Sequence, residues 1–133
     1  LSLIESTTFL GDPAVKMMHR TAALIRPKPS YLEWINRFHP PDAPMSADQV
    51  ARAASVFLLP EFARDEDRES YLRLISDDIL VVELESWLVD RRLWPSPRTY
   101  ALFQEWFEVE WHYMTYDASM DPGNALPGEG GSP

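Results

Sequence analysis

The amino-acid sequence predicts a small α+β domain in which a three-stranded sheet packs against helices. In the segment 97–117, apolar and aromatic residues first recur at helical spacing and then alternate with polar ones, as in a helix that runs into a strand. Two short apolar runs, 21–26 and 55–59, each end at a proline and predict two more strands. The long amphipathic segment 66–89 predicts the main helix. The expected order is therefore β-α-(α)-β-α-α-β.

Size and composition favour a single globular domain with its own hydrophobic core. The chain has 133 residues, of which 45% are hydrophobic, and a net charge of −9. Such an acidic surface disfavours nucleic acid and anionic membranes as partners, because both attract surfaces rich in Lys and Arg. The absence of cysteine excludes disulfides, thiolate metal sites and cysteine nucleophiles, and it fits a reducing cytoplasm. No apolar run approaches the ~20 residues of a membrane helix.

The composition divides the chain into three parts. Residues 1–18 are expected to form a peripheral N-terminal extension, because Gly, Asp and Pro at 11–13 break any regular element there. Residues 19–117 form the predicted α+β domain. Residues 118–133 are rich in Pro, Gly and acidic residues, a composition typical of a disordered tail.

The first strand is expected to be buried and to lead into a short helix. The apolar run 21–26 is followed by two prolines, which exclude a helix at that point. Ser30 and Glu33 have the S-x-x-E spacing of a capping box, in which each side chain accepts a hydrogen bond from the other residue's backbone N–H. The helix should therefore begin at Ser30 and end at His39, before two further prolines.

The same capping pattern recurs before the second strand. Ser46 and Gln49 predict a short helix over 47–54. The uncharged run 55–59 then predicts a second buried strand, which Pro60 ends.

The main helix 66–89 has Asp65 as its expected N-cap. Its apolar residues are expected to face the sheet in two neighbouring stripes: Leu72, Ile75, Ile79 and Val82, and then Leu80, Leu84, Trp87 and Leu88. A rigid turn follows, in which Ser96 should cap the last helix with Pro97 at its first position.

The last strand is predicted over 109–116. Both of its faces are substantially apolar in the second half, so we expect that half to be covered on both sides. Trp111 should pack against the main helix near Ile75, Ile79 or Val82.

Several short motifs occur together in the chain. They are IRPKP at 25–29 with Trp34 downstream, VFLLPE at 56–61, RTY at 98–100, EWFEVE at 105–110, and the Trp87 and Trp94-Pro95 region. In these motifs the chain from about residue 20 to 117 resembles a family of small uncharacterised bacterial proteins. The resemblance implies a single intact fold and a cytoplasmic setting, and it implies no activity or catalytic residue.

A polar pair is predicted on the last strand. Glu110 and His112 are two residues apart, so both should project from the same face of the strand. A carboxylate and an imidazole at this spacing could share a metal or a proton, and His39 and Asp117 could join them. The alternative is a partly exposed polar face with no chemical role.

Three cations are further candidates. Arg26 and Lys28 lie at the end of the first strand, where an anionic ligand could bind, although pairing with nearby carboxylates is the simpler expectation. Arg98 lies in the first turn of a helix, where the helix dipole disfavours a cation. Either an acid such as Glu61 or Asp90 holds it, or it is an exposed arginine with no partner.

The first functional hypothesis is a non-enzymatic protein-interaction module in the cytoplasm, with an acidic, aromatic-rich surface that binds another protein or itself. Trp94, beside a proline in a turn, is the expected exposed aromatic contact. The sequence has no phosphate-binding glycine loop, nucleophile elbow or zinc-protease motif, and no cofactor or metal is expected. The alternative is a small enzyme, or a ligand- or metal-binding protein, with its site at the sheet end around Glu110 and His112.

Overall fold

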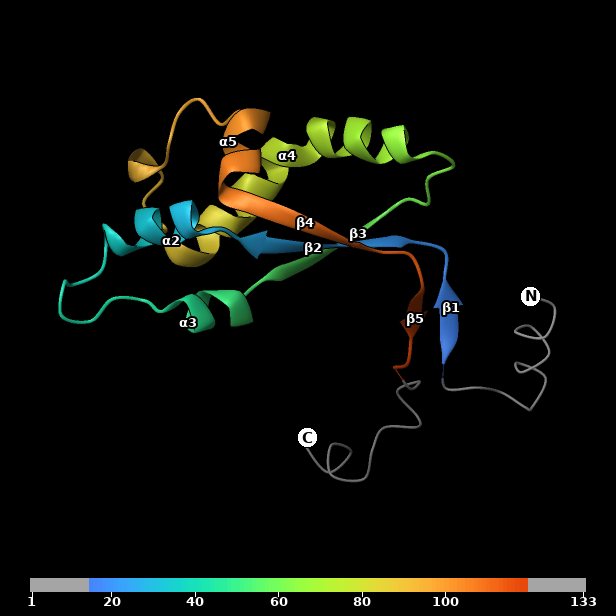
Figure 1. Cartoon of the computed structure of the whole chain (residues 1–133), viewed down its shortest axis with the longest axis horizontal. Coiled ribbons are helices and arrows are strands. Elements are labelled where there is room, and N and C mark those ends of the chain that lie inside the picture. Colours follow the sequence, from blue (N-terminus) through green and yellow to red (C-terminus); the bar gives the residue numbers. More distant parts are fainter. Residues whose placement is uncertain (1–14, 120–133) are drawn as a thin grey trace, which may run out of the picture.

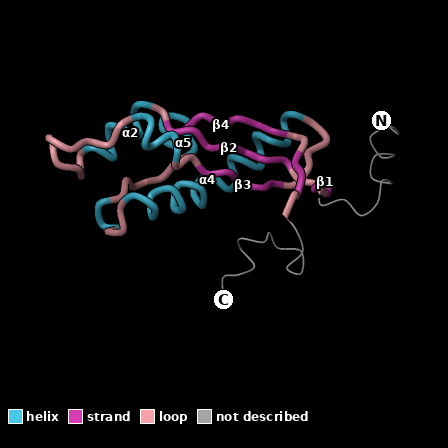
Figure 2. The backbone as a smooth tube through the Cα atoms, turned by 90° about the horizontal axis from the view of Figure 1, so that it is seen from below, coloured by secondary structure: helices cyan, strands magenta, loops and turns pink. Residues whose placement is uncertain are grey.

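A computed structural model describes residues 15–119, and it has the α+β architecture that the sequence predicts (Figure 1). Three antiparallel strands form the main sheet in the order β3-β2-β4, with β2 (Thr21–Pro27) between β3 (Ser55–Leu59) and β4 (Phe107–His112). Figure 2 shows the three strands side by side. A second, two-stranded sheet pairs β1 (Lys16–Met18) with β5 (Thr115–Asp117).

Four α-helices and one 3₁₀ turn are present in the described part of the chain. They are α2 (Pro29–Asn36), α3 (Ala47–Arg52), α4 (Asp65–Trp87), η2 (Arg91–Leu93) and α5 (Tyr100–Trp106). Figure 1 shows α4 and α5 on one side of the sheet, while the β1–β5 ribbon projects away from them. The order of strands and helices in the domain is the predicted one.

The strand register separates a covered face of the sheet from an uncovered one. Ala23 lies opposite Phe57 on one side and Trp111 on the other, and Ile25 lies opposite Val109. These residues face the helices, and both Ala23 and Ile25 are fully buried. We call the other side the open face; it carries Ala22, Leu24, Arg26, Val56, Leu58, Glu108, Glu110 and His112.

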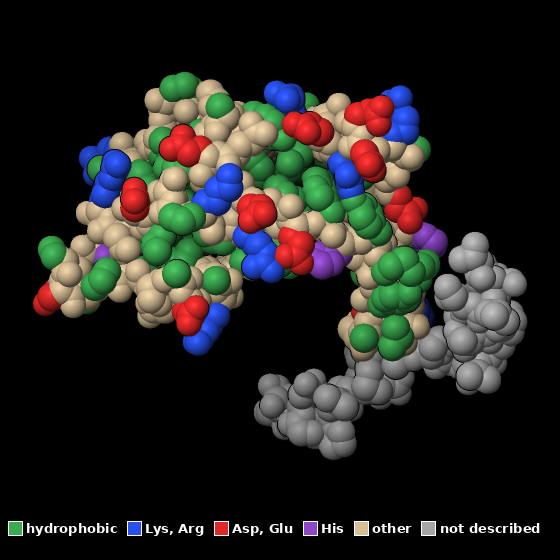
Figure 3. Space-filling model, in the orientation of Figure 1, with side chains coloured by type: hydrophobic (Ala, Val, Ile, Leu, Met, Phe, Trp, Pro, Cys, Tyr) green, Lys and Arg blue, Asp and Glu red, His purple; other side chains and the backbone are tan. Residues whose placement is uncertain are grey.

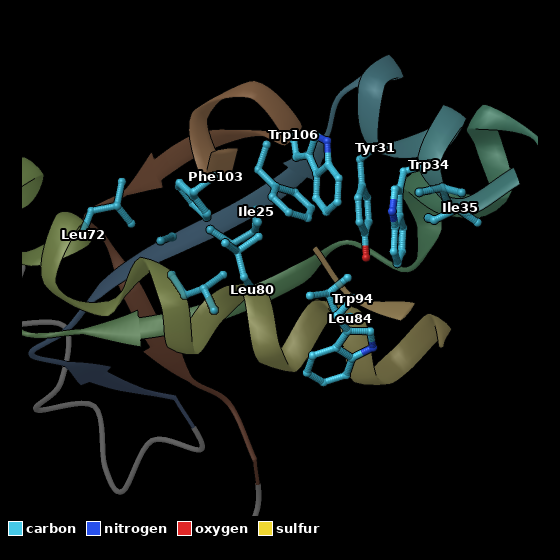
Figure 4. Close-up of a cluster of buried hydrophobic side chains, with 14 of the residues drawn as sticks. Ile25, Tyr31, Trp34, Ile35, Leu72, Leu80, Leu84, Trp94, Phe103 and Trp106 are labelled. Atoms are coloured by element: carbon cyan, nitrogen blue, oxygen red, sulfur yellow. The ribbon is translucent and has the colours of Figure 1, made fainter. Parts of the chain in front are cut away.

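The sheet is held to α2 and α5 by a cluster of aromatic side chains (Figure 4). The ring of Tyr31 lies 5.0 Å from that of Trp106 and 4.6 Å from that of Phe107, measured between centroids. Trp34 lies 5.2 Å from Trp106 in the same way. All four rings are buried, so this cluster links the start of α2 to the junction of α5 and β4.

The start of α2 differs from the prediction. The helix begins at Pro29, its N-cap is Lys28, and no side chain caps it, so the expected capping box of Ser30 and Glu33 is wrong. The backbone N–H of Lys28 instead donates a hydrogen bond of 2.8 Å to the carbonyl of Trp106. This tertiary bond fixes the turn, and a proline in the first turn loses no helical hydrogen bond.

The capping box at α3 is confirmed. The backbone N–H of Gln49 donates to the hydroxyl of Ser46 at 3.1 Å, and the N–H of Ser46 donates to the side chain of Gln49 at 2.8 Å.

The other two expected caps are each displaced along the chain. The N-cap of α4 is Arg64, so Asp65 is the first of three acidic residues in the first turn. Their negative charges interact favourably with the helix dipole there. Thr99, not Ser96, caps α5: its hydroxyl accepts a hydrogen bond of 3.1 Å from the N–H of Leu102.

The buried stripe of α4 includes two polar residues. Leu80 and Leu84 are fully buried as expected, but Ser76 and Glu83 are buried with them. The inward face is therefore rotated toward these two residues and away from Val82, whose predicted place in the stripe is wrong because it is exposed.

The strand predicted over 109–116 is interrupted. The chain leaves the main sheet after His112, and β5 pairs instead with β1, with Met17 opposite Tyr116. Tyr113, Met114 and Tyr116 are exposed, so the expected cover of this half on both faces is not present within residues 15–119. The predicted cover for one face is the N-terminal extension, the tail or a second subunit, and the structure describes only the part of the extension that forms β1.

Trp111 faces α4 but contacts a different part of it than predicted. It lies beside Arg68 and lines a groove with Leu72, in the first turns of the helix, while Val82 is exposed. The C-terminal half of β4 runs toward the beginning of α4, which accounts for the shift.

The expected N-terminal extension and tail fall mostly outside the described residues. Residues 1–14 and 120–133 are not described, so the structure does not bear on the predicted disorder of the tail. The last three residues of the predicted extension form β1.

The buried aromatic cluster generates a stability prediction. Trp106→Ala should lower the free energy of unfolding by about 3–5 kcal/mol, because it removes a buried ring that contacts both Tyr31 and Trp34. Trp111→Ala should cost less, since its ring is only partly buried. Urea denaturation followed by circular dichroism measures both, and equal losses would contradict the packing described here.

Candidate functional site

Three of the predicted polar residues form one cluster on the open face. The Nε of Arg26 donates to Oε1 of Glu110 at 2.7 Å, and Nε2 of His112 lies 2.5 Å from Oε2 of the same carboxylate. Glu110 and His112 project from the same face of β4, as the two-residue spacing predicts. Arg26 comes from the neighbouring strand β2 and reaches Glu110 diagonally across the sheet.

This cluster favours the ionised form of the Glu110 carboxylate. The hydrogen bond from Arg26, followed by that from His112, lowers the pKa of Glu110. A carboxylate that is stabilised in this way is a weak general base. Glu110 and His112 supply only two ligands, and no group of three His, Asp or Glu residues in the described region is arranged to hold a metal ion.

The remaining polar candidates lie elsewhere. His39 follows α2, whereas His112 ends β4, and Figure 1 shows α2 near one end of the main sheet and the end of β4 at the other. The Nζ of Lys28 donates to the backbone carbonyl of Gln104 at 2.8 Å, on the helical side of the sheet. The structure therefore brings together Arg26, Glu110 and His112, and it does not bring His39 or Lys28 to them.

Of the two alternatives for Arg98, the structure shows the one in which an acid holds it, but the acid is not one of the two named. Its Nε donates to Oδ1 of Asp77 on α4 at 2.8 Å, and not to Glu61 or Asp90. Asp77 and Arg98 lie 21 residues apart, and the contact between α4 and α5 that brings them together is a tertiary one, which sequence spacing does not predict.

Trp94 is not an exposed contact residue. It is 8% exposed, and its indole N–H donates to the carbonyl of Leu88 at 2.7 Å. The guanidinium groups of Arg91 and Arg98 lie over its ring at 4.9 and 5.9 Å. The turn around its proline folds the indole back onto the end of α4, so the prediction that Trp94 is an exposed aromatic is wrong.

Exposed apolar side chains lie on β3 and on the β1–β5 ribbon, and others lie on α4 and in loops. Val56 is 59% exposed and Leu58 is 53% exposed, so the prediction of a buried strand at 55–59 is wrong for one of its faces. Both residues lie on the open face, beside Ala22 and Leu24 of β2. Figure 3 shows hydrophobic side chains gathered over the ribbon as well.

The two edges of the main sheet differ in chemistry. The edge strand β4 carries Glu108, Glu110 and His112 on the open face, and charged side chains discourage pairing with another strand. The other edge strand, β3, reads Ser-Val-Phe-Leu-Leu and has no charge, proline or glycine. In the described part of the chain, β3 pairs only with β2, so its outer edge is open.

A groove runs along the helical side of β4. It has a volume of about 280 Å³ and lies between the first turns of α4, α5 and the inner side chains of β4. Lys28 and Arg68 line it together with buried Leu72, Phe103 and Phe107. Of the residues that the sequence singles out as polar candidates, Lys28 alone lines this groove.

Sequence reasoning missed a buried carboxylate in α4. Glu83 is 2% exposed, and its Oε2 has no hydrogen-bond partner. Burial raises the pKa of Glu83, and a hydrogen bond with the Ser55 side chain offsets part of this increase. A signal was present: Glu83 lies four residues after Ile79 and next to Leu84, so it shares the inward face of the helix.

Comparison of the chain with family models, with curated proteins and with solved structures finds no match. The resemblance of its motifs to a bacterial family therefore stays a prediction. No helix in residues 15–119 has the length and apolar character needed to cross a membrane.

The polar cluster generates a prediction about pH. Because the pKa of Glu110 is lowered in the folded state, its ionised form contributes stability above the unfolded pKa, and this contribution is lost as pH falls through the folded pKa. Glu110→Gln should therefore destabilise the protein slightly at neutral pH and not in acid, the effect being small because the pair is exposed. Urea denaturation across pH measures it. Glu108→Gln is the control, since Glu108 has no ion pair in the described region; an equal pH dependence in this control would count against the cluster.

Glu83 generates a prediction of opposite sign. Its pKa is raised in the folded state, so the folded protein is most stable relative to the unfolded chain below the unfolded pKa. Stability then decreases as pH rises through the folded pKa, because a charge appears in the core. Glu83→Gln should remove this decrease and stabilise the protein at neutral pH. Asp78→Asn, on the exposed side of the same helix, should leave the decrease in place.

Proposed function

We propose that this protein is a protein-interaction module that assembles by pairing its edge strand β3 with β3 of a second copy of the chain. The observation that carries the proposal is the uncharged, half-exposed strand at an open sheet edge. Its unpaired backbone N–H and C=O groups can extend the sheet, and alternate side chains provide the specificity. The lack of cysteine favours a reducing compartment such as the cytoplasm.

The strand lacks the features that keep an edge from pairing. Natural proteins protect exposed edges with lysine, proline, a bulge or an inward-pointing charge. The strand β3 has none of these between Ser55 and Leu59, whereas β4 carries charge on its open face. The difference between the two edges of one sheet favours β3 as the one that pairs.

The side-chain pattern of β3 is complementary to itself in the antiparallel direction. If the two strands pair about Phe57, Val56 lies opposite the partner's Leu58 and Leu58 lies opposite the partner's Val56. Both contacts then lie on the open face and join two apolar side chains, an arrangement that stabilises antiparallel pairs. Phe57 lies opposite the partner's Phe57 on the helical side.

The charges at the two ends of β3 favour the same direction. Arg52 is the last residue of α3, three residues before the strand, and Glu61 lies two residues after the strand. An antiparallel pair brings the beginning of one β3 to the end of the other and so brings opposite charges to the same end of the interface, whereas a parallel pair would bring like charges together. The Glu61 side chain is accessible, its nearest ionic neighbour being His19 at 3.6 Å.

The enzyme hypothesis has less support. Arg26, Glu110 and His112 do lie together, but on an exposed sheet surface, and none of them lines the groove beside β4. Water would screen their charges, and no wall would position a substrate. A ligand-binding role has more support from the groove than from this cluster.

The proposal predicts the oligomeric state of two matched variants. Wild-type protein should form dimers in the micromolar range, and Leu58→Lys should raise the dimer dissociation constant at least tenfold, about 1.4 kcal/mol, by placing two like charges in the paired edge. Leu74→Lys should have no effect, because Leu74 is 75% exposed on α4, outside the proposed interface. Light scattering coupled to size exclusion, over a range of concentrations, measures all three proteins.

Two outcomes would overturn the proposal. One is a wild-type protein that stays monomeric at concentrations of hundreds of micromolar. The other is an equal loss of dimer in Leu58→Lys and Leu74→Lys, which would show that association depends on exposed apolar residues in general and not on β3. Slowed hydrogen exchange of the β3 amides at high concentration should accompany the dimer if the strand is its interface.

A further inference from the structure

We infer that the groove beside β4 is a binding site for a small organic acid with a planar apolar body, with Arg68 receiving the acidic group. This inference is independent of the proposed assembly, because the groove lies on the helical side of the sheet and at the opposite edge from β3. Its volume of about 280 Å³ is at the small end of the range for ligand pockets.

The accessible apolar part of the groove lies on β4. Leu72, Phe103 and Phe107 are only 1–5% exposed, so they form the base of the groove and offer little surface of their own. Val109 and Trp111 point to the same face as Phe107 and are only partly buried. A flat apolar ligand placed against these two side chains would remove their exposed surface from water.

Arg68 is placed to receive a negative charge. Its guanidinium carbon lies 5.2 Å from the ring centroid of Trp111 and 5.3 Å from that of Tyr113, so the two rings hold the side chain in position. The side chain is only 21% exposed. Its ion-pair partner, Asp65 at 3.4 Å, is 90% exposed, so this pair is strongly solvated and contributes little.

The other charges of the groove leave an excess of positive charge. Glu69 is already compensated, because it accepts from the hydroxyl of Tyr100 at 3.2 Å and from Arg73 at 3.5 Å. Lys28 uses one of its three ammonium hydrogens on the carbonyl of Gln104. The lining thus has two cations and one anion in a chain whose net charge is −9. A local positive charge in so acidic a protein selects for an anionic ligand.

The two cations lie toward opposite ends of the groove. Lys28 follows Pro27, which pairs with Phe107, whereas Arg68 lies over Trp111. Four residues of strand separate Phe107 from Trp111, a distance of about 13 Å. One acidic group can therefore bind Arg68, while the body of the ligand extends along the strand toward Lys28.

The test compares 2-naphthoate with its neutral isostere 2-naphthamide, using wild-type protein labelled with ¹⁵N. Titration with 2-naphthoate should shift the indole N–H resonance of Trp111 and saturate in the micromolar to millimolar range. The amide should bind at least tenfold more weakly, because it forms no charge-assisted hydrogen bonds with Arg68. Equal binding of the two compounds would contradict the claim that the negative charge of the ligand contributes to binding. If neither compound shifts the Trp111 resonance, the groove is not a binding site for such ligands.

A matched pair of variants assigns the effect to Arg68. Arg68→Gln should raise the dissociation constant for 2-naphthoate at least tenfold, while Arg64→Gln, which removes the same charge from the same helix region, should leave it unchanged. Arg64 pairs with Asp67 at 3.0 Å and does not line the groove. Unperturbed resonances of the α2 and β2 amides verify that both variants are folded, and equal weakening in the two would overturn the assignment to Arg68.

Discussion

The junction between α5 and β4 organises this fold. The chain passes from helix to strand between Trp106 and Phe107 with no connecting residue, and both side chains are buried against Tyr31. The carbonyl of Trp106 also accepts the hydrogen bond from the backbone of Lys28 that sets the start of α2. One pair of residues therefore fixes the direction of β4, the position of α2 and the contact between them. The packing of the two rings against Tyr31 gains both from buried area and from ring geometry, and the backbone hydrogen bond adds to it.

The sequence predicted features that depend on local periodicity and local hydrogen bonds. The change of spacing around Phe107 identified the helix–strand junction, and Ser46 with Gln49 identified the start of α3. The projection of Glu110 and His112 from one face also follows from spacing alone. In each of these cases the deciding interaction lies within a few residues of the chain, so the pattern contains the information.

Features set by tertiary contacts could not be predicted in the same way. The prediction of a cap at Ser30 was wrong because the start of α2 is set by a backbone hydrogen bond from Lys28 to Trp106, two residues far apart in the sequence. An uncharged run such as β3 reads as buried, and only the order of the strands shows that it lies at an edge. Trp94 is buried because its turn folds back on Leu88, a contact that composition does not reveal. In the candidate site, spacing found the residues of β4 but not Arg68, whose importance comes from its stacking on Trp111.

A three-stranded sheet has only one central strand. Its two edge strands have unpaired backbone groups, and its open face is not covered by helices, so other features must protect them. Here β4 is protected by charge on its open face and by α5 on its helical side, and the space that remains beside it is the groove at Arg68. The edge at β3 has no such protection. If two copies pair at β3, the combined sheet has six strands, and both β4 strands become its outer edges. The groove then stays accessible in the dimer, and each proposed site can be occupied without blocking the other. The proposed assembly surface and the proposed ligand site thus lie at opposite edges of the same three-stranded sheet.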